Sequence, residues 1–308
     1  MKKFKLLFLM FLTLSCFSQE DTLNLGKEFT FNYEGDSIEG LYFGDNNKSK
    51  PLLLFIQGSG LNPLFLSDSL GRKYPLFITS LISEQINLII LSKPGIPRIV
   101  ELKDLNSNYD YLIGDSIPPK LFSKLNYLDC QVKLHNKCIS YLKNNYKYSK
   151  LIVAGHSQGA RITAELSVNK HVDKIIYMSA DPLGRIAVRY DKEYSKFEEH
   201  SKAKLKFYNS VFKENNQSNL WGNDTFKTWV SFSKPSLIAL SKSEIPTLIV
   251  YGTLDKSCPN CYTFSFLPSY YDNISVFKYE NYGHNYSDPE GEYHWDIVVK
   301  DVYSWILK

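Results

Sequence analysis

A serine flanked by glycines is the residue of this chain best placed for covalent chemistry. Residues 155–159 read Gly-His-Ser-Gln-Gly, with an apolar run before them and a helical pattern after them. A serine hydroxyl is a weak nucleophile, so it needs a base within hydrogen-bond reach and a third group that orients that base. The two glycines allow a sharp strand-to-helix turn that lifts the hydroxyl clear of the backbone. The pattern therefore predicts that Ser157 is a nucleophile.

An acid and a base that could complete this chemistry stand later in the chain. Asp255 and His284 each come just after an apolar run of the kind that precedes the serine. Sites in parallel sheets lie beyond the carboxyl ends of the strands, so these side chains belong on the same edge of the molecule as Ser157. Asp181 also follows an apolar run and is a rival for the role of the acid.

The other histidines compete with His284 for the role of the base. His156 adjoins the nucleophile but is expected to point away from it as part of the turn. His135 lies on an apolar helical stripe, where a packed core histidine is the default. His294 could face the site from the start of the last helix, but a structural role is the expectation. The remaining competitors are His171 and His200.

Continuous apolar runs alternate with helical patterns along most of the chain. Such runs indicate strands that are buried on both faces, as in a parallel sheet covered by helices. The predicted strands are residues 51–56, 86–91, 151–154, 174–179, 247–251 and 274–279, and the predicted helices are 128–142, 160–168 and 295–307. An antiparallel hairpin, 29–33 and 37–43 around a turn at 34–36, precedes them. This order predicts an α/β fold with a doubly wound, mostly parallel sheet.

One long segment, residues 184–242, does not follow the alternation. It is charged and also rich in aromatic residues, namely Trp221, Phe226, Trp229 and Phe232. It is longer than a connection between two strands requires. We therefore expect a mainly helical cap, inserted between two strands and lying over the predicted site.

The order of Ser157, Asp255 and His284 along the chain resembles that of the α/β-hydrolase superfamily. The sequence Tyr-Gly-Thr-Leu-Asp at 251–255 and Tyr-Gly-His-Asn at 282–285 stand where that family places its acid and its base. The resemblance covers nearly all of the chain after the leader, as a single hydrolase domain over residues 19–308 with its cap. It implies a catalytic triad of the three residues.

The same resemblance implies an oxyanion hole made of two backbone N–H groups. One belongs to Gln158, the residue after the nucleophile. The other would come from residues 57–60, where Gln-Gly-Ser-Gly stands in place of the family's common His-Gly pair. Ser59 is the candidate because it follows the glycine.

Family resemblance implies hydrolysis of a small-molecule carboxylic ester through an acyl-enzyme intermediate, with no metal or organic cofactor. A serine aminopeptidase-like peptidase or a thioesterase would use the same triad. For a peptidase, Glu193, Glu198 and Glu199 could hold a free amine, although charge runs are usually solvated faces. The alternative from another class is a non-catalytic binding protein that retains the fold.

The N-terminus has the pattern of an export signal. Lysines at positions 2, 3 and 5 precede an apolar run that is too short to cross a bilayer. Cleavage before Gln19 would remove residues 1–18 and deliver the protein to the periplasm or the medium. A lipoprotein signal acylated at Cys16 is the alternative, but Thr-Leu-Ser at 13–15 matches such signals poorly. Losing three lysines and no acid lowers the net charge from +4 to +1, which gives no reason to expect nucleic acid or an anionic membrane as partner.

Four cysteines remain after the leader. Cys130 and Cys138 lie roughly 12 Å apart along one predicted helix, too far to bridge. Cys258 and Cys261 could close a small disulfide loop three residues after Asp255. A redox pair would need a thioredoxin-like context, and a metal site would need two further ligands; neither is evident.

Overall fold

The computed structural model describes residues 25–114, 116–186, 205, 209–213 and 220–308. The predicted export signal, with Cys16, lies outside the described residues, as do Glu193, Glu198, Glu199 and His200. In the described part of the chain, no helix combines the length and the apolar character that crossing a membrane requires.

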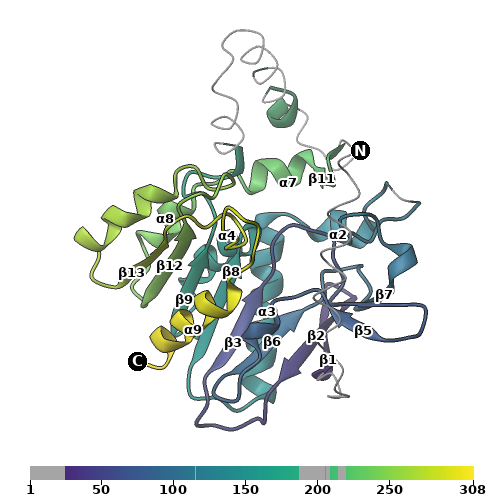
Figure 1. The fold of residues 1–308 in the computed structure, drawn as a ribbon, viewed down its shortest axis with the longest axis horizontal. Coiled ribbons are helices and arrows are strands. Elements are labelled where there is room, and N and C mark those ends of the chain that lie inside the picture. Colours follow the sequence, from purple (N-terminus) through teal and green to yellow (C-terminus); the bar gives the residue numbers. More distant parts are fainter. Residues whose placement is uncertain (1–24, 115, 187–204, 206–208, 214–219) are drawn as a thin grey trace.

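An eight-stranded sheet forms the centre of the molecule (Figure 1). Its strands, in spatial order, are β1 (Lys27–Tyr33), β2 (Asp36–Phe43), β6 (Asn87–Leu91), β3 (Leu52–Ile56), β8 (Leu151–His156), β9 (Lys174–Met178), β12 (Thr247–Gly252) and β13 (Ile274–Tyr279). β1 and β2 form the predicted antiparallel hairpin, β2 is also antiparallel to β6, and all other pairs are parallel. The predicted sheet is confirmed.

Helices cover both faces of this sheet (Figure 1). They are α2 (Lys120–Leu125), α3 (Leu128–Asn145), α4 (Gln158–Leu166) and α9 (Trp295–Ile306). Leu52 and Leu54 of β3 pack in one core cluster with residues of α3 and α4. The alternate residues, Leu53 and Phe55, pack in another cluster with residues of α9. Because both faces of β3 are buried, its sequence is a continuous apolar run rather than an alternating one.

A second, small sheet was not expected from the sequence. It joins β5 (Lys73–Pro75), β4 (Phe65–Ser67) and β7 (Ile99–Glu101) in that order, and the short 3₁₀ helices Thr79–Leu81 and Leu102–Asp104 follow β5 and β7. Strands of three residues are too short to show a periodic pattern. This region lies between β3 and α2 in sequence, and residues 76–80 within it line the site described below.

The insertion, residues 184–242, connects β9 to β12. Its described part contains a two-stranded ladder, β10 (Leu220–Trp221) with β11 (Asp224–Thr225), and two short helices, α7 (Phe226–Ser231) and α8 (Ser236–Leu240). α8 contacts α4, and α7 contacts α3. The predicted helical cap includes residues 187–204, 206–208 and 214–219, which lie outside the described residues.

Candidate active site

Ser157 stands at a sharp turn between β8 and α4. Its backbone has φ 56° and ψ −120°, a conformation that is strained for a residue with a side chain. A Cβ atom on Gly155 would lie 2.3 Å from the backbone of Gly159, and one on Gly159 would lie 2.1 Å from the carbonyl oxygen of Ile56. The turn therefore requires glycine at both positions, which is why the sequence pattern could reveal it.

A continuous line of hydrogen bonds joins Ser157, His284 and Asp255. His284 Nε2 lies 3.0 Å from Ser157 Oγ. On the other side of the ring, Nδ1 lies 3.0 and 2.9 Å from the two carboxylate oxygens of Asp255. Nδ1 donates to the carboxylate, so Nε2 is left to accept the serine hydroxyl proton. The Asp255 side chain is fully buried, and the Ser257 backbone N–H donates to it at 2.7 Å.

The loops that carry the acid and the base are in direct contact. A Cβ atom on Gly252, at the end of β12, would lie 2.1 Å from the carbonyl oxygen of Tyr282. Leu254 donates its N–H to that same carbonyl at 2.9 Å, and Asn281 donates its N–H to Thr253 Oγ1 at 2.9 Å. Main-chain contact therefore fixes the separation of Asp255 and His284.

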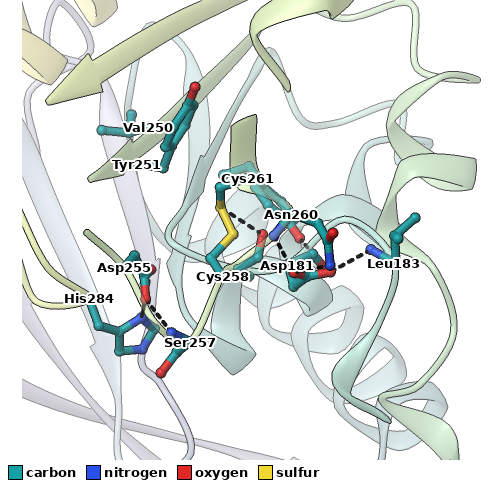
Figure 2. The surroundings of a disulfide bond; sticks show 12 residues. Asp181, Leu183, Val250, Tyr251, Asp255, Ser257, Cys258, Asn260, Cys261 and His284 are labelled. Carbon is teal, nitrogen blue, oxygen red and sulfur yellow. Dashed lines mark hydrogen bonds and ion pairs between the residues drawn. A yellow bond between two sulfur atoms is a disulfide. The ribbon is translucent and has the colours of Figure 1, made fainter. Parts of the chain in front are cut away.

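The rival acid, Asp181, has other partners. Its carboxylate accepts the N–H of Leu183 at 2.9 Å and the backbone and side-chain N–H groups of Asn260 at 3.0 and 3.1 Å (Figure 2). Burial raises the pKa of this carboxyl group. Of the two candidate acids, the structure brings only Asp255 to His284.

The prediction that His156 points away from the site is wrong. Its Nε2 lies 2.9 Å from the backbone carbonyl oxygen of His284, and the two rings are 4.8 Å apart between centroids. Burial lowers the pKa of His156 to about 3, so the ring is neutral and its Nε2–H donates to that carbonyl. His156 thus positions the loop of the base, a role that adjacency in sequence did not reveal.

Two other histidines lie where the sequence predicts. His135 is buried in α3 and bonds the carbonyl of Gln131 through Nδ1 at 2.7 Å, and burial lowers its pKa to about 4. His294 bonds Asp288 through Nε2 at 2.8 Å. Neither ring contacts Ser157 or Asp255.

The two predicted oxyanion donors flank the serine. Ser59 and Gln158 both line the space next to Ser157. Within the described part of the chain, neither backbone N–H donates to another protein group. The loop that carries Ser59 approaches Ser157 closely at Gly58, where an added Cβ atom would lie 3.3 Å from Ser157 Cβ.

Charged side chains hold the loop of Ser59 in place. Lys93 Nζ donates to the Gly60 carbonyl oxygen, and the N–H of Leu61 donates to Asp110 Oδ1 at 2.7 Å. Burial lowers the pKa of Lys93 to about 8. Sequence reasoning gave neither side chain a role, because each bonds a loop that is distant from it in sequence.

Two cavities meet at Ser157 and His284. The larger, about 610 Å³, extends from Ser59 toward Phe77 and Trp295. The smaller, about 280 Å³, extends toward the insertion. The serine is therefore open on two sides, as cleavage of a bond between two substrate groups requires.

A disulfide joins Cys258 and Cys261 just after the acid (Figure 2). The N–H of Cys258 donates to the carbonyl of Asp255 at 3.0 Å, so the closed loop is bonded directly to the residue that holds His284. Cys130 and Cys138 are free and buried.

Opening this disulfide should lower both stability and turnover. Replacing Cys258 and Cys261 with serine removes a constraint worth about 2 kcal/mol for so short a loop, which corresponds to a fall in Tm of about 5 °C. Turnover should fall several-fold because the loop of Asp255 loosens. Calorimetry and kinetics with and without reductant check this, and the double variant serves as control because reductant should not affect it. Unchanged Tm and turnover in reduced wild-type protein would remove any role for the bond.

Comparison with known proteins gives the fold. No family model and no curated protein sequence matches the chain. Among solved structures, it is similar to the acylaminoacyl peptidase of Pyrococcus horikoshii, with a TM-score of 0.57 and 13% identity over 91% of this chain and 40% of that one. It therefore spans about two fifths of the peptidase's length.

Two esterases match over most of their own length. Est1E from Butyrivibrio proteoclasticus, solved with ferulic acid bound, has a TM-score of 0.57 and 14% identity over 91% of this chain and 98% of that one. An acetyl xylan esterase from Paenibacillus sp. R4 has a TM-score of 0.54 and 16% identity over 93% and 86%. At these identities the likeness concerns the fold alone: the chain has the α/β-hydrolase fold.

Proposed function

We propose that this protein is a serine hydrolase that cleaves carboxylic esters. The observation that carries the proposal is the hydrogen-bonded line from Ser157 through His284 to Asp255, at distances of 2.9 to 3.0 Å. A strained serine backed by an oriented histidine and a buried carboxylate is the arrangement that activates a hydroxyl for acyl transfer.

In the proposed mechanism, Ser157 Oγ attacks the acyl carbon while His284 Nε2 takes its proton. Negative charge develops on the carbonyl oxygen, and the N–H groups of Ser59 and Gln158 stabilise it. The imidazolium, stabilised by Asp255, then gives its proton to the departing alkoxide. Water attacks the acyl-enzyme in the second half-reaction, His284 takes a proton from it, and the acid leaves as Ser157 regains its hydrogen.

Esters are preferred over peptides on the basis of the matched structures. The two esterases align over 98% and 86% of their own length, whereas the peptidase aligns over 40% of its length. One fold supports many substrates, so a direct comparison of substrates decides between an ester and a peptide. A peptidase and a thioesterase remain the competing activities.

A substrate panel tests the choice. Purified protein should hydrolyse 4-nitrophenyl esters, from acetate to longer acyl chains, at rates well above those for aminoacyl 4-nitroanilides. The reason is that, among the described residues, no Asp or Glu lines either cavity to hold the free amine of an aminoacyl group. Absorbance at a fixed pH measures both leaving groups in parallel. Turnover of the anilides alone would reassign the protein as a peptidase.

A further inference from the structure

The smaller cavity beside Ser157 is lined by two positively charged side chains. Its wall contains two arginines, Arg161 of α4 and Arg185 of the insertion, together with Trp229 of α7. The reacting groups of Ser157 and His284 line the same cavity. None of the steps proposed above uses either guanidinium group.

Arg161 is buried without a carboxylate partner. Only 6% of the residue is exposed, and the single hydrogen bond of its side chain in the described part of the chain runs from Nη1 to the backbone carbonyl of Asp181 at 3.0 Å. Burial lowers the pKa of the guanidinium and Arg185 acts in the same direction, although Tyr177 and Asp181 oppose them. A buried charge is costly unless it is paired, so a structural role alone would favour an uncharged side chain here.

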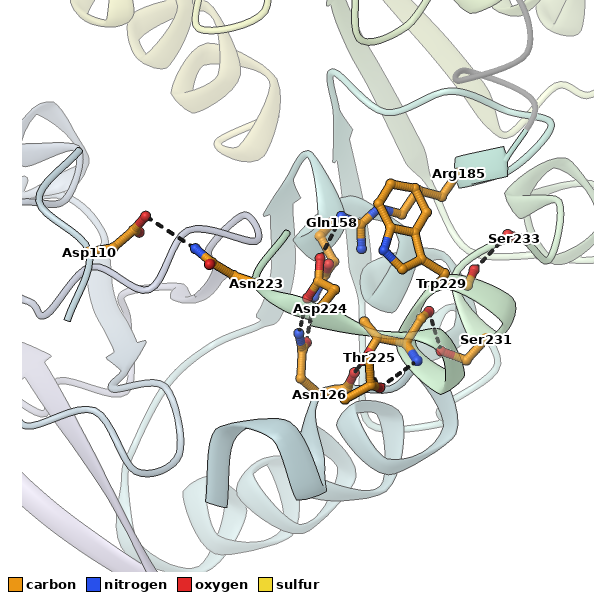
Figure 3. A network of polar contacts seen from close by, with 11 residues as sticks. Asp110, Asn126, Gln158, Arg185, Asn223, Asp224, Thr225, Trp229, Ser231 and Ser233 are labelled. Atoms are coloured by element: carbon orange, nitrogen blue, oxygen red, sulfur yellow. Dashed lines mark hydrogen bonds and ion pairs between the residues drawn. The ribbon is translucent and has the colours of Figure 1, made fainter. Parts of the chain in front are cut away.

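Arg185 already has a partner for its charge. Its guanidinium lies 3.8 Å from the centre of the Trp229 ring and 2.5 Å from Asp224 Oδ2 (Figure 3). Its Nη1 is nevertheless buried with no acceptor among the described residues. The carboxylate of Asp224 therefore pairs with the charge of Arg185. The charge of Arg161 has no such carboxylate among the described residues and faces the cavity.

Asp181 and Asp255, the two buried acids described above, have partners other than the Arg161 guanidinium. The carboxylate of Asp181 is held by Leu183 and Asn260, and only its backbone carbonyl reaches Arg161. Asp255 is bonded to His284. A ligand carboxylate in the cavity would accept from the remaining N–H groups of Arg161, since guanidinium donors match the two oxygens of a carboxylate.

We infer that the cavity beside Arg161 binds an ionised carboxylate of the substrate, so that the preferred substrates are esters that carry a second, acidic group. This rests on the proposed ester hydrolysis. The acidic group belongs either to the acyl part, as in a half-ester of a dicarboxylic acid, or to the alcohol part. The same recognition chemistry serves both.

Matched pairs of substrates test the inference on each side of the bond. For the acyl side we would compare mono(4-nitrophenyl) adipate with methyl 4-nitrophenyl adipate, and for the alcohol side 4-(carboxymethyl)phenyl acetate with its methyl ester. Protein with Ser157→Ala serves as the blank for spontaneous hydrolysis. On one of the two sides, the ionised ester should have a kcat/KM about ten- to a hundred-fold above its methyl ester, as expected for a charge-assisted bond.

Variants then assign the preference to Arg161. In Arg161→Gln the ratio of ionised to neutral turnover should fall to about one, and Arg161→Lys should retain part of it. Arg72→Gln is the control, because Arg72 is 65% exposed and pairs with Asp68 on the surface. If Arg161→Gln does not fold, inhibition of the wild-type protein decides instead: adipate should inhibit about tenfold more strongly than 1,6-hexanediol, a neutral compound of the same chain length that contains no ester bond.

The outcomes separate this inference from the proposed function. Turnover of the methyl esters with no preference for either ionised partner would overturn the carboxylate site and leave the hydrolase intact. A preference that survives in Arg161→Gln would also overturn it, as would equal inhibition by adipate and 1,6-hexanediol. Failure to hydrolyse any of the four esters would remove the proposed function itself.

Discussion

Replacing Ser157 with alanine is expected to abolish both covalent labelling and turnover. A fluorophosphonate should modify the wild-type protein at Ser157, and the variant should give no adduct in intact-mass spectrometry. Ester turnover should fall about 10⁴-fold or more, because the hydroxyl that is hydrogen-bonded to His284 Nε2 is that of Ser157. Labelling of the folded protein is the measurement that separates an enzyme from a binding protein that retains the fold.

A matched control lies at the other end of the same helix. Ser167 follows α4, is buried, and has a hydroxyl with no partner among the described residues. Ser167→Ala should keep both the label and the turnover. An adduct on Ser157→Ala protein at an equal level would refute the assignment of the nucleophile.

Replacing Asp255 with asparagine should lower kcat by about 10⁴-fold while the fold survives. The amide cannot hold the proton on Nδ1 of His284, so the ring presents the wrong tautomer to Ser157 and cannot accept its proton. Steady-state kinetics on a 4-nitrophenyl ester measures the loss, and Tm measures the fold.

Asp181→Asn separates catalysis from loop stability. This change leaves His284 untouched but places an amide against the N–H groups of Leu183 and Asn260, so it should lower Tm and reduce kcat by less than about tenfold. The reverse ranking, with the greater loss of kcat in Asp181→Asn, would reassign the acid.

Much of the fold could be predicted because burial on both faces leaves a continuous apolar run. β3, β8 and β12 are all of this kind, and the glycines at 155 and 159 mark the turn through contacts that no side chain could make. The small sheet of β4, β5 and β7 could not be predicted, since strands of three residues carry no period.

Those site residues could be predicted whose role depends on their position just after the end of a strand. Ser157, His284 and Asp255 are of this type, and they meet in the structure. The roles of His156 and Arg161 depend instead on which groups they meet across the fold. A histidine that bonds the loop of the base and an arginine that faces a cavity have no local signature, so sequence patterns alone predicted the wrong orientation for His156 and no role for Arg161.

The polar network at the insertion links it to the serine turn (Figure 3). Asp224 holds Arg185 on one side and accepts from Asn126 Nδ2 at 2.8 Å on the other, and Asn126 Oδ1 accepts from Gln158 Nε2 at 2.7 Å. A chimera that took its insertion from another protein of this fold would leave Asn126 without its acceptor and Gln158 less firmly held. The insertion therefore cannot be exchanged independently of the rest of the fold. Exchanging it to alter substrate choice would also disturb the turn at Ser157.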